Sequence, residues 1–317
     1  MNKPAAVIDK CLFQEVCALE PEPARESCWN WLCDRYQLVI PVVMVEEVLV
    51  NAVAPGRKEN EVIKTMCREL LRFQPCWMDD VHEIAFAELV EDRPLQKLPA
   101  PSETIVARLL GLQLDDPDLV EWVTQRKREK EETARNWKAA QDSLLPSSER
   151  VTVSSEEEFF DRTAKREFLL ALQDPSRRLV MLETILGRKF RRRHPHASGR
   201  IDAAFKAYGP DNFMRYPHTL NCLTARLAYF LAPLVAVKQQ GEAQAKCLLK
   251  SGEKPQRNNV EDEQYLISAL VCSRLLTRDR GLANIAEVFQ AARVWKGKTE
   301  YLDPKFPVEA QIAALPR

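Results

Sequence analysis

Acidic residues lie near both ends of the chain at positions where they could hold a metal ion. Asp9 and Asp279 each end a short apolar run, Glu46 and Glu47 follow another, and Asp262 leads a helical segment. Short apolar runs of this kind suit the buried strands of a parallel sheet. Because functional groups gather beyond the carboxyl ends of such strands, we expect Asp9, Glu46 or Glu47, Asp262 and Asp279 to converge at one edge of a sheet.

Carboxylates that converge on one point repel one another unless a cation neutralises them. No histidine or cysteine belongs to this set, and hard oxygen ligands favour Mg²⁺ or Mn²⁺. One or two such ions could clamp a phosphate and activate a water for in-line attack. The acids therefore point to metal-dependent hydrolysis of a phosphodiester.

Asp262 is assigned by the apolar stripe that follows it at helical spacing, which consists of Tyr265, Leu266, Ala269, Cys272 and Leu276. An acid at the head of a buried stripe should face the sheet rather than solvent. Its neighbours Glu261 and Glu263 are alternative ligands. At the second position Glu46 remains an alternative to Glu47.

A basic segment, GRKFRRRHPHASGR at 187–200, contains no acid. The cations expected to bind nucleic acid are Arg188, Lys189, Arg191, Arg192 and Arg193. In a chain with 46 Lys plus Arg and 46 Asp plus Glu, this is the strongest local positive charge, and it could neutralise several phosphates. Phe190 could stack on a base, and His194 or His196 could add contacts. A solvated surface paired within the chain is the alternative. The mixed-sign stretch 125–132 is expected to be an exposed helix face.

The elements that position these residues alternate at the two ends of the chain. Strands are expected at 5–8, 37–41, 73–78, around 275–277 and at 292–297, with helices at 42–53 and 62–73 beside them. Further helices are expected at 102–112, 118–140, 154–173, 174–190 and 217–238. We therefore predict one α/β domain, 1–115 and 251–317, interrupted by a mostly helical insertion at 116–250.

Three segments resemble PIN-domain nucleases: VIDKCLF at 7–13, LVIPVVMVEEVL at 38–49, and VEDEQYLISALVCSRLLTRDRGL at 260–282. The resemblance implies a PIN-like open parallel sheet with an acid-lined cleft that hydrolyses RNA, preferred here, or single-stranded DNA. The metal ligands that it implies are Asp9, Glu47, Asp262 and Asp279, with Thr277 supporting an acid or phosphate through its hydroxyl. The long insertion departs from many family members and could reshape the substrate channel.

The composition and the absence of certain motifs narrow the remaining functional classes of protein. The chain has only nine glycines, and no Gly-rich phosphate loop or GxSxG motif occurs. Its nine cysteines form no CxxC pair, which suggests reduced thiols in a cytoplasmic protein. No apolar stretch reaches the ~20 residues of a membrane helix. Two other functions stay open: a catalytically silent PIN-like module that binds nucleic acid or protein, and a toxin or defence effector controlled by a partner. The insertion could also form a homodimer surface.

Overall fold

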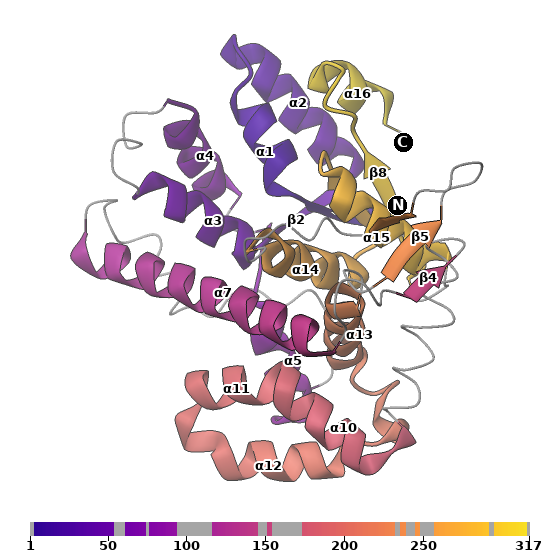
Figure 1. Ribbon diagram of the computed structural model, residues 1–317. Helices are drawn as coiled ribbons and strands as arrows, with labels where there is room; N and C mark the ends of the chain where they lie inside the picture. The colour runs from indigo at the N-terminus through magenta and orange to yellow at the C-terminus, as the bar shows by residue number, and fades with distance from the viewer. Residues whose placement is uncertain are drawn as a thin grey trace.

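A computed structural model describes most of the chain (Figure 1). The described residues are 3–53, 61–73, 76–93, 116–144, 151–153, 173–231, 235–238, 245–247, 257–291 and 295–315. The helix expected at 102–112, and nearly all of the one expected at 154–173, lie outside these ranges.

A five-stranded parallel sheet with the order β3-β2-β1-β7-β8 forms the centre of the fold. Its strands are β1 (Ala5–Ile8), β2 (Gln37–Pro41), β3 (Trp77–Met78), β7 (Arg274–Thr277) and β8 (Lys298–Tyr301). Val7 lies opposite Val39 on one side and Leu275 on the other. The expected α/β class and the strands at 5–8 and 37–41 are confirmed. β3 is shorter than the 73–78 expected.

The strand expected at 292–297 is wrong, because the last strand of the sheet is β8. Trp295, within the expected segment, is instead a core residue before β8, 5% exposed. Its indole N–H donates to the carbonyl oxygen of Cys272 at 3.0 Å.

The strand order reverses direction at β1. From β1 the chain passes through α1 (Lys10–Cys17) and α2 (Glu22–Arg35) to β2 on one side. From β7, which is the other neighbour of β1, it passes through α15 (Arg280–Ala291) to β8 on the far side. Open parallel sheets bind ligands at the carboxyl ends of the strands where the order reverses, and here those strands are β1 and β7.

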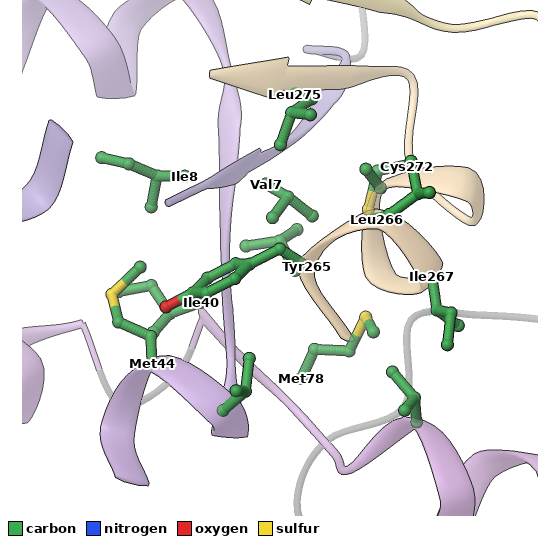
Figure 2. Packing of buried hydrophobic residues seen from close by; sticks show 14 of the residues in the cluster. Val7, Ile8, Ile40, Met44, Met78, Tyr265, Leu266, Ile267, Cys272 and Leu275 are labelled. Atoms are coloured by element: carbon green, nitrogen blue, oxygen red, sulfur yellow. The ribbon is translucent and has the colours of Figure 1, made fainter. Parts of the chain in front are cut away.

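Apolar side chains from α3 and α14 pack against the strands (Figure 2). Val7 and Leu275 come from adjacent strands, and Tyr265 and Leu266 come from α14. Tyr265 reaches from α14 toward Met44 of α3. The helices of this part of the fold, besides those named above, are α3 (Val42–Ala52), α4 (Glu61–Arg72), α5 (Val81–Leu89), α14 (Arg257–Leu270) and α16 (Val308–Ala314). The helices predicted at 42–53 and 62–73 are confirmed within one residue.

The described residues of the stretch expected to be an insertion, 116–250, lie largely in helices. The long helix α7 (Pro117–Leu144) passes close to α3 and α14 (Figure 1). Below it in the same view lie α10 (Pro175–Leu182), α11 (Arg188–Arg193) and α12 (Ser198–Ala207). A π-helical turn (Glu183–Gly187) joins α10 to α11, and short 3₁₀ turns (Pro195–Ala197 and Pro210–Asn212) flank α12. α13 (Pro217–Leu231) then leads back toward α5 and α14.

This region also holds a small sheet that the sequence did not predict. Its strands are β4 (Val151–Val153), β5 (Val235–Lys238) and β6 (Ala245–Cys247). The helix predicted over 217–238 therefore ends at Leu231, and its last residues pair as β5. Pro233 in the sequence explains the break, because proline removes a helix hydrogen bond and disfavours helical backbone before it.

In the described part of the chain, no helix has both the length and the apolar character needed to cross a bilayer. The eight cysteines with described side chains are all free thiols.

Candidate active site at the carboxyl edge of the sheet

Asp9 lies at the reversal of strand order and is held there by both neighbouring strands. It follows β1 directly, and its side chain is 2% exposed. Its backbone N–H donates to the carbonyl oxygen of Leu276 in β7 at 3.0 Å. One carboxylate oxygen accepts from the N–H of Leu12 at 2.8 Å, which caps α1, and the other accepts from the hydroxyl of Thr277. An aspartate after a strand thus begins the next helix, as capping residues commonly do.

Asp279 repeats this arrangement at the end of β7. Its carboxylate accepts from the N–H of Leu282 at 2.9 Å, at the start of α15. Its own N–H donates to the hydroxyl oxygen of Thr277 at 2.9 Å. Thr277, the last residue of β7, therefore contacts both aspartates. The sequence thus predicted the position of Asp9, Thr277 and Asp279 at one sheet edge.

Two helices bring further acids to the same edge. Asp262 lies in the second turn of α14, because that helix begins at Arg257 rather than at Asp262 as expected. Glu47 comes from α3 and accepts from the hydroxyl of Tyr265 at 2.7 Å. The ammonium of Lys10 lies 3.3 Å from the other oxygen of Glu47. Tyr265 follows Asp262 by three residues, so this face of α14 is directed at α3.

The acids interact strongly enough to change one another's protonation. Burial raises the pKa of Asp262 well above its usual value, and the charges of Asp279, Glu47 and Asp9 raise it further. Burial also raises the pKa of Glu47 to about 7, with Glu261 adding to the effect. The four predicted acids therefore share one electrostatic environment in which the ionised forms repel one another.

The pKa of Asp9 is raised by the same causes, but hydrogen bonds to its carboxylate partly oppose the increase. Burial is the main cause of a rise in this pKa to about 6. The charge of Asp279 also raises the pKa, whereas the hydrogen bonds from Thr277 and Leu12 lower it. Among the described residues, no lysine or arginine forms an ion pair with Asp9, Asp262 or Asp279. Within the described ranges, no cationic side chain therefore compensates their negative charge.

Such a set of oxygen donors is chemically suited to Mg²⁺ or Mn²⁺, but the side chains do not converge as a finished site. No three or more His, Cys, Asp or Glu side chains in the described ranges are placed together to hold a metal ion. The hydrogen bonds explain this: both oxygens of Asp9 accept bonds, and Glu47 is held by Tyr265 and Lys10. Binding an ion would require these side chains to turn toward one another.

Glu46, one of the alternative acids, lies away from this edge. Glu46 is 1% exposed and lies against α7, where its oxygens meet Arg126 and, at 3.1 Å, Lys130. Burial alone would raise the pKa of Glu46, but Arg126 and Lys130 outweigh it and lower that pKa. Glu47, not Glu46, is therefore the member of the pair beside the other acids.

Glu261 and Glu263 have cationic partners too. Lys130 lies 3.3 Å from Glu261, and Arg226 pairs with Glu263. Asp262 alone of the three consecutive acids in α14 lacks a cation among the described residues.

The expectation of an exposed helix face at 125–132 holds for Lys127 and Arg128 but is wrong for the other two cations, Arg126 and Lys130. Lys130 is 6% exposed, and Arg126 reaches both Glu46 and, at 3.1 Å, Asp80. The two cations are four residues apart on α7, so they lie on one side of the helix. That side faces α3 and α14, and the cations therefore meet buried acids instead of water.

Four of the five arginines of the basic segment are paired within the chain. Arg188 pairs with Glu132, and Arg192 lies 3.2 Å from Glu129. Arg191 bridges Glu183 and Asp202, and Arg193 bridges Asp80 and Glu83. These contacts match the alternative of an intrachain-paired surface rather than a free track for a nucleic-acid strand.

The base contacts expected of Phe190 and His194 are not supported either. Phe190 is 1% exposed and packs on Phe86 and Phe205. His194 stacks on Phe86 and lies 2.9 Å from Glu83. Only His196 of the three remains exposed. Phe190 and His194 hold α11 to α5, so neither is available to stack on a base.

Sequence reasoning missed an acid pair at the end of β3. Asp79 and Asp80 follow that strand as Asp9 follows β1. Asp80 accepts from the backbone N–H of His82 at 2.8 Å and lies 2.9 Å from its Nδ1. Burial raises the pKa of Asp79 to about 7. The signal was the acid doublet after the expected strand at 73–78. His82, which looked unremarkable, is buried between Asp80 and Lys189.

The fold and site thus define an α/β protein whose open parallel sheet carries, at its reversal of strand order, carboxylates that no described cation pairs with. No protein-family model matches the chain, and no significant match was found among curated proteins or solved structures.

Proposed function

We propose that the chain is a metal-dependent nuclease of the PIN-like type that hydrolyses phosphodiester bonds. The observation that carries the proposal is the group of Asp9, Asp262 and Asp279, uncompensated by described cations, beside Glu47 at the reversal of strand order. Ionised carboxylates are costly to bury without a counterion. Perturbed acids of this kind mark functional sites more often than chance, and a divalent cation would supply the missing charge.

Each residue has a definite part in this proposal. Asp9, Glu47, Asp262 and Asp279 would hold Mg²⁺ or Mn²⁺, and Thr277 would keep Asp9 and the backbone of Asp279 in place. When bound, such an ion neutralises phosphate charge and activates a water. Lys10 pairs with Glu47 at the same edge, and its side chain is 26% exposed. It could therefore turn from Glu47 to a substrate phosphate. The preference for RNA over single-stranded DNA rests on the resemblance to PIN-domain nucleases.

Cleavage of labelled single-stranded RNA and DNA oligonucleotides, with Mn²⁺, Mg²⁺ or EDTA, tests the proposal. The variant is Asp279→Asn, because asparagine removes the charge but still caps α15. Asp211→Asn is the matched control, since Asp211 is exposed in the turn after α12. We expect metal-dependent cutting by the wild type and the control, and a loss of well over about tenfold in Asp279→Asn. Cutting in EDTA, or by Asp279→Asn at the wild-type rate, would overturn the proposal.

A second candidate, a catalytically silent module that binds nucleic acid or protein, is favoured by one observation. No described carboxylates converge to hold a metal as they stand, and Glu47 already has Lys10 and Tyr265 as partners. Binding of the same oligonucleotides without cleavage, by protein that is folded and metal-loaded, would support it. Growth arrest on expression that Asp279→Asn relieves would instead point to an effector nuclease restrained by a partner.

A further inference from the structure

A small cavity lies between α7, α11 and α14, away from the acid group. Half of its twelve lining residues are cationic: Arg126, Lys130, Arg188, Lys189, Arg192 and Arg193. Two acids, Glu129 and Glu132, also line it. Its volume is about 60 Å³, several times the ~10–15 Å³ that one water needs. The cavity therefore suits one compact anionic group and is too small for a nucleobase.

Lys189 is the unusual cation of this cavity. Its ammonium lies 2.9 Å from Nε2 of His82. The other ring nitrogen of His82 lies 2.9 Å from Asp80, so a proton on Nδ1 leaves Nε2 to accept from Lys189. In the described part of the chain no carboxylate lies within ion-pair distance of Lys189. The site therefore places a cation that lacks an anionic partner inside a cavity.

The other cations fall into an inner and an outer group. Arg193 and Arg126, in the inner group, are held rigidly by Asp80. In the outer group, the side chains of Arg188 and Arg192 are 61% and 41% exposed. They are one helical turn apart on α11 and pair with the two lining acids of α7. Exposed pairs of this kind contribute about 0–1 kcal/mol, so these arginines can exchange an acid for a stronger anion.

We infer that this cavity binds a phosphate monoester group, with Lys189 as its central cation and Arg188 and Arg192 closing over it. Arginine guanidinium groups match the oxygens of a phosphate in pairs, and lysine binds them as a point charge. Free phosphate and the terminal phosphate of a nucleotide or strand share this chemistry. The inference does not depend on the nuclease proposal, because none of the four acids of that site lines the cavity.

The charges around Lys189 predict that binding is coupled to a proton. Burial lowers the pKa of Lys189 to about 7, and the nearby charge of Arg226 on α13 lowers it further. The charged and titratable groups that face Lys189 come from several elements. They are Asp80 just before α5, His82 in α5, Arg193 in α11, Arg226 in α13 and Glu263 in α14. A bound dianion favours the charged ammonium. Lys189 should then take up a proton when the anion binds at pH 8.

Isothermal titration calorimetry of the full chain tests the inference. The buffers are free of divalent cations, so that the acid site does not contribute to binding. The probes are inorganic phosphate, AMP and a short 5′-phosphorylated oligonucleotide, with the 5′-hydroxyl oligonucleotide as control. We expect saturable binding of at least one phosphorylated probe, and proton uptake at pH 8 that two buffers of different ionisation enthalpy reveal. If phosphate binds as tightly as the other probes, free phosphate is a sufficient ligand. If only the phosphorylated oligonucleotide binds, the site recognises the phosphorylated end of a strand.

Lys189→Met should weaken that binding at least about tenfold, as expected for a lost charge-assisted hydrogen bond. Lys206→Met, at an exposed lysine of α12, should leave it unchanged. Arg192→Gln, also at an exposed position, should weaken it too and serves if Lys189→Met fails to fold. No saturable binding of any phosphorylated probe, or unchanged affinity in both cavity variants, would overturn the inference.

Discussion

Replacing Asp9 by asparagine should stabilise the metal-free protein at pH 8. Burial raises the pKa of Asp9 from 3.8 to about 6. A raised carboxyl pKa means that the folded state binds the proton more tightly than the unfolded state. The stability that this proton provides is present below the unfolded pKa and is lost as the pH rises through about 6. At about 1.4 kcal/mol per pKa unit, the ionised form then lowers the free energy of unfolding by about 3 kcal/mol.

Asparagine removes this charge and keeps the local structure. It is as good a helix cap as aspartate, so it can still accept from the N–H of Leu12. Its amide can donate to the hydroxyl oxygen of Thr277 in place of accepting from it. We therefore expect Asp9→Asn to raise the free energy of unfolding by about 1–3 kcal/mol at pH 8. The gain should shrink as the pH falls from about 6 to about 4 and vanish only below about pH 3, where the wild-type carboxyl is protonated in both states.

Urea unfolding of the wild type, Asp9→Asn and the control Asp211→Asn, at pH 4, 6 and 8 in metal-free buffer, measures this effect. Mn²⁺ should then stabilise the wild type at pH 8 and do so less in Asp9→Asn. A variant that is less stable than the wild type at pH 8, or a stability difference that does not change with pH, would refute the reasoning. It would mean that Asp9 has a charged partner that the described residues do not include.

Two further changes probe the Thr277–Asp9 contact at the acid group and the Glu46 contacts between α3 and α7. Thr277→Val keeps the side-chain shape but removes the hydroxyl that donates to Asp9, so we expect the affinity for Mn²⁺ to fall by about 10–100-fold. Calorimetric titration with Mn²⁺ measures this affinity, and an unchanged value would exclude Thr277 from the site. Glu46→Gln leaves Arg126 and Lys130 short of a buried counterion. It should lower the free energy of unfolding by about 3–5 kcal/mol, and urea unfolding that shows a loss below about 1 kcal/mol would show that α7 does not depend on this network.

The sequence predicted the central strands well because burial makes them continuous apolar runs. β1 and β2 are AAVI and QLVIP, flanked on both sides in the sheet, and their ends could be read directly. β8 reads KTEY and lies at the edge, so it carries no such signal. β3 has two residues, too few for any period to be detected. Edge strands were therefore missed or misplaced where central ones were not.

The candidate site shows the same division between local and long-range information. Asp9 and Asp279 could be predicted because each aspartate directly follows a strand and caps the next helix. The partners of α7 could not, because Arg126 and Glu46 are 80 residues apart. Charged residues four apart on a helix look the same in sequence whether they face solvent or buried acids. Only tertiary packing decides, and here it turned an expected solvent face into the contact with α3.

The strand order also determines when the sheet can be completed during synthesis. β1 is the central strand, but its second neighbour, β7, begins only at Arg274. At a ribosomal rate of about 5–20 residues per second, roughly ten to fifty seconds separate the two strands. Throughout that time one edge of β1 has no β-partner, and unpaired edges can template aggregation. The nascent chain therefore has to shield the free edge of its own central strand. A chaperone bound between the synthesis of β3 and that of β7 would act while this edge is still unpaired.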